Sequence, residues 1–172
     1  MTTGRSGSRK ALLSVHVLAS VGAFGADLTL LVLGVASVLG VDPRSVYPAA
    51  DLVGRLLVQP LAIVSLLTGV SLGLVTPWGL LRYWWTAIKL AITLALSAVV
   101  VLVLVPRLGA ASAVATASGP ASFAAADRLP LLLAPVLGSS LLALNVVLAV
   151  YKPGWRLRRA PSQVPAAQPG LA

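Results

Sequence analysis

Four long stretches that carry almost no charge constrain this chain more than any other feature. The first, 11–41, holds one carboxylate, Asp27, and one histidine, His16. The other three hold no charged residue: 56–81, 90–106 and 129–151. A helix needs about 20 mostly apolar residues to cross a hydrocarbon core of about 30 Å. The sequence therefore predicts an all-α fold, a four-helix transmembrane bundle.

The composition agrees with lipid as the solvent for most of the chain. Of the 172 residues, 58% are hydrophobic and only 10% are charged, whereas a soluble domain usually carries about 25% charged residues. At this length we expect one bundle without a separate soluble domain. The chain has no cysteine, which excludes disulfides, iron–sulfur ligation and thiolate metal sites.

Basic residues crowd the ends of the apolar stretches and give the chain a net charge of +9. Those in the two termini and the second loop are Arg5, Arg9, Lys10, Arg82, Lys152, Arg156, Arg158 and Arg159. Those in the first and third loops are only Arg44, Arg107 and Arg128. Because Lys and Arg favour the cytoplasmic side, we expect a multi-pass plasma-membrane protein with both termini in the cytoplasm and anionic lipid head groups as partners. Nucleic acid is not an expected partner, because the sequence has no basic stripe with interleaved aromatic residues.

Turn signals give the expected boundaries of the spans. These are about 11–38, 52–75, 84–105 and 129–151. Residues 1–10 are expected to form a mobile basic N-terminus, and residues 152–172 a basic, disordered cytoplasmic tail. The stretch 107–128 is rich in Ala, Ser and Gly. We interpret it as a flexible loop, with or without a short helical piece.

Local signals refine the first two spans. Asp51 is placed to cap the second helix, where its side chain can accept hydrogen bonds from free backbone N–H groups. Pro60 lies inside that helix and is expected to kink it. A cleaved signal peptide is the alternative interpretation of the first stretch, with Ala23-Phe24-Gly25 as the cleavage site. The apolar run continues well past that point, which a signal peptide does not require.

Polar residues inside the spans are the best candidates for a functional site, since an ionisable group near the membrane centre costs about 2.5–3.5 kcal/mol. His16 and Asp27 are eleven residues apart, almost three helical turns, so they share one face of the first helix. The topology predicts two polar layers at different depths. The inner layer comprises His16, Lys89 and Asn145, and the outer layer Asp27, Arg55 and Gln59.

Each of these residues also has a purely structural interpretation. Lys89 can extend to the cytoplasmic head groups, and Asp27 with Arg55 can form a structural ion pair. Asn145 and Gln59 can hydrogen-bond between helices, and His16 can be a hydrogen-bonded packing residue. No catalytic residue is predicted, because the sequence has no Gly-rich phosphate loop, no paired His with metal spacing and no Ser-His-Asp set.

Several short motifs resemble those of a known group of proteins. They are Ser14-Val15-His16-Val17-Leu18-Ala19, Leu67-Thr68-Gly69, and Trp85 followed by Lys89. Over about 11–105 the chain resembles small bacterial predicted-integral-membrane proteins, which are distantly similar to the copper-resistance D-type and protoporphyrinogen-oxidase J-type bundles. In the latter a first-helix histidine is associated with haem, so the resemblance implies a haem role for His16. The chain has one histidine and its only methionine is Met1, so a bis-His or internal His–Met haem site cannot form within one chain.

Three functions follow as hypotheses. The absence of catalytic signatures favours a non-catalytic structural or accessory membrane protein, which holds a partner protein or self-associates. The first alternative is a small proton-coupled transporter that uses Asp27, with His16 and Lys89 near the inner gate. The second alternative is a haem- or copper-related redox membrane protein that uses His16.

Overall fold

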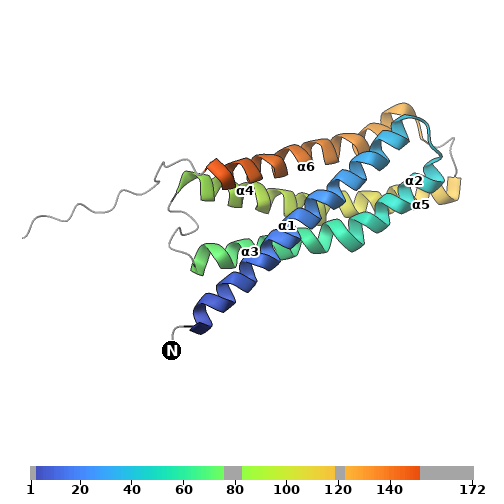
Figure 1. Cartoon of the computed structure of the whole chain (residues 1–172). Coiled ribbons are helices and arrows are strands. Elements are labelled where there is room, and N and C mark those ends of the chain that lie inside the picture. Colours follow the sequence, from blue (N-terminus) through green and yellow to red (C-terminus); the bar gives the residue numbers. More distant parts are fainter. Residues whose placement is uncertain (1–2, 76–82, 119–122, 152–172) are drawn as a thin grey trace, which may run out of the picture.

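The computed structural model describes residues 3–75, 83–118 and 123–151, and these residues form four long helices (Figure 1). The first is α1 (Thr3–Val38), and the last is α6 (Ala125–Tyr151). The second runs through α2 (Pro43–Val53), the π-helical η1 (Gly54–Val58) and α3 (Gln59–Val75). The third runs through α4 (Trp84–Val99), the π-helical η2 (Val100–Leu104) and α5 (Val105–Ser118). All four are long and apolar enough to cross a membrane, which confirms the predicted all-α four-helix bundle.

Each helix of the bundle packs against two others, and α1 crosses its neighbours obliquely (Figure 1). Helix α1 lies against α6 and α3, and α4 also lies against α3 and α6, so α1 and α4 are diagonal partners. At the other end of the bundle α2 packs against α5. We call the two ends the α2–α5 end and the α3–α4 end.

The hydrophobic core lies at the α2–α5 end. Its buried members are Ala26, Leu30, Val46, Tyr47, Ala50, Val58, Leu108, Ala115 and Leu131. Tyr47 stacks on Phe123 with 4.5 Å between ring centroids, and its hydroxyl donates to the Asp127 carbonyl at 3.4 Å. The described parts of α3 and α4 bury only one side chain each, Ser65 and Ser97. Apolar packing therefore holds the α2–α5 end far more tightly than the α3–α4 end.

Three of the four long helices continue through prolines, and in two of them a π segment lies just before a proline. The π segment η1 ends two residues before Pro60, and η2 ends two residues before Pro106. Proline has no N–H and its ring collides with the preceding turn, and a local π adjustment lets the helix re-pair the freed backbone groups inside a membrane. The predicted end of the third span near Val105 was therefore wrong, because the helix continues to Ser118.

The interpretation of 107–128 as a flexible loop was also wrong over the described part. Residues up to Ser118 belong to α5, whose frequent alanines have the highest helix propensity. Small side chains also let α5 approach α2 closely, and Leu108 and Ala115 are buried there. The residues 119–122 lie outside the described part of the chain.

Three of the four long helices start earlier than the sequence predicted, and the third starts at Trp84 as predicted. Helix α2 begins at Pro43, and its cap is Asp42, whose carboxylate accepts from the Arg44 backbone N–H at 3.0 Å. Proline suits the first position of a helix because no intrahelical partner is lost there. Asp51, the predicted cap, lies inside α2. Residues 3–10, predicted to be mobile, form the first turns of α1; adding turns to an existing helix costs less than nucleating one.

The α1–α6 seam, the line of contact between these two helices, is closest at Gly34. A Cβ atom on Gly34 would lie 2.5 Å from the Leu131 carbonyl oxygen and 2.7 Å from the Leu132 Cα. Pro135 is fully buried and has no N–H, so the Leu131 carbonyl lacks its usual helical partner. The bare Cα of Gly34 lets this carbonyl approach, as small residues do at membrane helix crossings.

We expect Gly34→Ala to lower the free energy of unfolding by about 1–3 kcal/mol, because its methyl group would collide with the α6 backbone. Gly25 is a matched control on the same helix, since it is exposed and a Cβ there would meet nothing within 4 Å. Gly25→Ala should leave the stability unchanged or raise it. Chemical unfolding of both variants in detergent micelles measures this difference, and equal effects would contradict the close crossing.

Candidate functional site

Three polar side chains of α1, those of His16, Ser20 and Asp27, lie along one face but meet two different neighbours. His16 and Ser20 are half-buried against α3, whereas Asp27 is buried against α6. This division follows from the oblique path of α1, because the same face passes from one neighbour to the other along its length (Figure 1).

His16 is fixed to α3 by its Nδ1 atom. That nitrogen lies 3.1 Å from the Ser65 carbonyl oxygen and 3.0 Å from Thr68 Oγ1. A carbonyl only accepts, so Nδ1 carries the proton and Nε2 of the neutral ring holds a lone pair. Gly69 gives the ring room, because a Cβ there would lie 3.0 Å from His16 Cε1.

Further hydrogen bonds between helices continue along α3. Ser20 Oγ and Ser65 Oγ are 2.8 Å apart and join α1 to α3. Ser97 Oγ donates to the Ala62 carbonyl at 3.4 Å and joins α4 to α3. These bonds replace the apolar contacts that are scarce at the α3–α4 end.

Asn145 links α6 to α4. Its Nδ2 donates to Thr93 Oγ1 at 3.1 Å, and Thr93 Oγ1 donates to the Lys89 carbonyl at 2.9 Å. The Lys89 ammonium lies 6.0 Å from the centroid of the Trp85 ring, within the range of a cation–π interaction. The predicted inner layer is thus divided, since Asn145 bonds to Thr93 on α4 while His16 bonds to α3 and the Lys89 ammonium lies by Trp85.

Asp27 is only 7% exposed and faces the backbone of α6. Ser139 Oγ donates to Asp27 Oδ2 at 2.6 Å. Gly138 provides the space for the carboxyl group, because a Cβ there would lie 2.9 Å from Oδ1 and 3.1 Å from Oδ2. The carboxyl group therefore sits directly on α6, with one hydroxyl as its hydrogen-bond donor.

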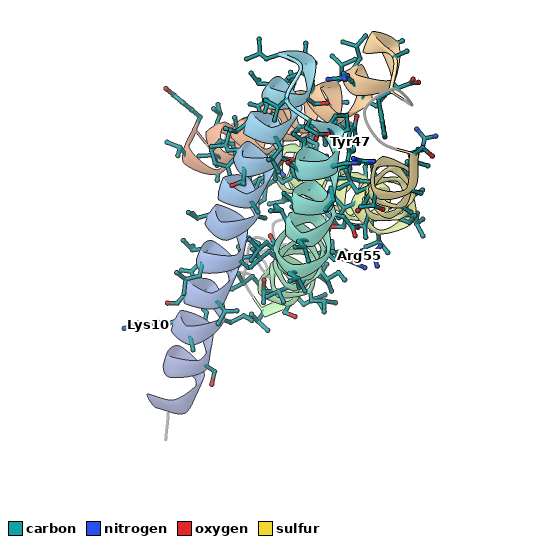
Figure 2. All side chains as sticks on the ribbon, turned by 90° about the vertical axis from the view of Figure 1, so that its right-hand side faces the viewer. Lys10, Tyr47 and Arg55 are labelled. Carbon is teal, nitrogen blue, oxygen red and sulfur yellow. The ribbon has the colours of Figure 1, made fainter. Side chains whose placement is uncertain are left out.

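The expected pairing of Asp27 with Arg55 was wrong. Arg55 Nε instead donates to Asp51 Oδ1 at 2.6 Å, one turn earlier on the same helix. A partner four residues away is reached with less loss of side-chain freedom than a partner on another helix. Arg55 is exposed and points away from α1, and Gly109 on α5 leaves room for its guanidinium (Figure 2). Gln59 is half-buried at the first position of α3.

Sequence reasoning did not identify the partners of these polar residues. Thr68-Gly69 and Gly138-Ser139 each place a small residue beside a hydroxyl inside a span. That combination is typical of contacts between membrane helices, and it is the signal that could have identified the partners of His16 and Asp27. Among the described residues no group of three or more His, Cys, Asp or Glu side chains could hold a metal ion. No protein-family model, no curated protein and no solved structure matches this chain.

We expect Ser139→Ala to lower the free energy of unfolding by about 0.6–1.7 kcal/mol, the usual value of a hydrogen bond between membrane helices. Ser140→Ala is the matched control, because the Ser140 hydroxyl donates to the Val136 carbonyl of its own helix. That variant should have little effect. Thermal unfolding of the two variants in the same detergent gives the comparison, and an equal loss in both would show that the Asp27 contact adds nothing.

Proposed function

We propose that this chain is a multi-pass integral protein of the plasma membrane that acts as a non-catalytic structural or accessory bundle. The observation that carries this proposal is that three polar side chains inside the spans bond to neighbouring helices. His16 bonds to α3, Asp27 to α6, and Asn145 to α4. A site for chemistry would leave such groups facing a substrate, whereas here they fix the helices to one another. The lipid-facing surface would then receive a partner membrane protein or a second copy.

An absorption spectrum of the detergent-purified protein, together with metal analysis, tests this function. We expect no Soret band and no stoichiometric metal. We also expect His16→Ala to lower the thermal unfolding temperature, because the variant loses the bonds to Ser65 and Thr68. A Soret band that disappears in His16→Ala would overturn the structural assignment.

We further propose that both termini lie in the cytoplasm, beside anionic head groups. Arg9 and Lys10 support this orientation, since both are exposed on the first turns of α1, and Lys10 extends from that helix far from the α2–α5 end (Figure 2). Basic side chains at a span end favour the cytoplasmic leaflet.

Single-cysteine variants test this orientation cleanly because the chain has no native cysteine. Ser8 and Ser45 are both exposed and lie at opposite ends of the bundle. A membrane-impermeant maleimide should label Ser45→Cys in intact cells and Ser8→Cys only after the membrane is permeabilised. The reverse pattern, or labelling of both in intact cells, would contradict the proposal.

One observation favours a haem- or copper-related redox protein as a second candidate. The Ser65 carbonyl holds the proton of His16 on Nδ1, and metal-binding histidines commonly use such a bond to direct Nε2 toward the metal. His16 would therefore hold a haem or copper group through Nε2, and that group would supply electron transfer when bound. A second histidine or internal methionine ligand would come from another chain. The remaining alternative, a proton-coupled transporter, requires Asp27 to gain and lose a proton.

A further inference from the structure

No positive side chain faces Asp27 in the described part of the chain. The elements packed against α1 are α2, η1, α3 and α6. Their charged residues are Arg44, Asp51, Arg55, Asp127 and Arg128, and α3 has none. On α1 itself the nearest titratable group is His16, eleven residues or about 16 Å along the helix axis.

The charged groups of the neighbouring helices are engaged elsewhere. Arg55 pairs with Asp51, and Arg128 Nη1 donates to the Ser37 carbonyl at 2.8 Å. Asp127 Oδ2 accepts from the Ala124 backbone N–H at 3.0 Å, and Arg44 is exposed at the start of α2. On α4 the Lys89 ammonium lies 6.0 Å from the centroid of the Trp85 ring. None of these groups compensates a negative charge on Asp27.

A lone carboxylate in an apolar interior is so costly that the group neutralises instead. Carboxylates that stay ionised when buried accept several hydrogen bonds or pair with a cation. Asp27 is 7% exposed, and its one hydrogen-bond donor in the described chain is the Ser139 hydroxyl. The surroundings of Asp27 thus suit a neutral acid and not an anion.

We propose that Asp27 is a proton-binding site: in the closed α1–α6 seam its carboxyl group is a neutral acid, and it releases the proton only when the seam opens to water. Release breaks the O–H bond, leaves the electron pair on the carboxylate oxygen and passes the proton to water. This proposal assigns a ligand, the proton, and does not depend on the structural role proposed above.

Close packing is the reason why the seam must open. The space next to Gly138 is so narrow that even one added carbon would lie 2.9–3.1 Å from the Asp27 oxygens. Gly34 brings the same two helices into contact further along, at the Leu131 carbonyl. Water therefore has no room between the carboxyl group and α6 while the two helices remain together, and α1 and α6 must part before Asp27 can ionise.

Infrared spectroscopy of the full wild-type chain in liposomes tests the proposal, and its result does not depend on any variant that must fold. Protein labelled with ¹³C-carboxyl aspartate should show the carbonyl stretch of a protonated acid at neutral pH. If Asp27→Asn folds, that band should be absent from it and the thermal unfolding temperature should remain close to wild type, because one neutral group replaces another. A wild-type spectrum with only carboxylate bands would overturn the proposal.

Discussion

Hydrocarbon offers no hydrogen bonds, so a polar group of these helices is costly unless it finds a partner within the protein. In the described part of the chain the buried Ser37 Oγ and Asn145 Oδ1 are the side-chain exceptions. This constraint explains how the chain treats its prolines and its hydroxyl side chains. Prolines 60 and 106 follow π segments that redistribute the backbone bonds. Hydroxyls such as those of Thr29 and Ser71 bond to carbonyls of their own helix. Only a few polar side chains, such as Ser139, reach a neighbouring helix.

The two ends of the bundle use different interactions. Tyr47, Phe123 and their neighbours form a packed apolar core at the α2–α5 end. At the α3–α4 end the helices are joined by bonds such as Asn145 to Thr93. A hydrogen bond between membrane helices contributes only about 0.6 kcal/mol on average. Local opening is easiest where few buried contacts must be broken, so the α3–α4 end should separate first.

The sequence predicted the features that depend on composition and helical period. The uncharged stretches specify four helices, and the spacing of His16 and Asp27 specifies a common face. The partners of these residues could not be predicted, because depth in the membrane says nothing about which neighbour an oblique helix meets. Arg55 was assigned to Asp27 by depth alone, whereas Asp51 was available one turn away. The helix beyond Pro106 was not predicted, because a proline usually ends or kinks a helix in a water-soluble protein.

The π segments give the second and the third long helix two orientations each. A π turn holds one residue more than an α turn, so the side chains beyond it are rotated by about 100° relative to an uninterrupted helix. The helix from Pro43 to Val75 can therefore direct Tyr47 toward Phe123 and the start of α6 in the core, and then direct Ser65 toward α1. One continuous helix thereby makes two kinds of contact, apolar packing in the core and hydrogen bonds to α1. No loop interrupts this helix between Pro43 and Val75.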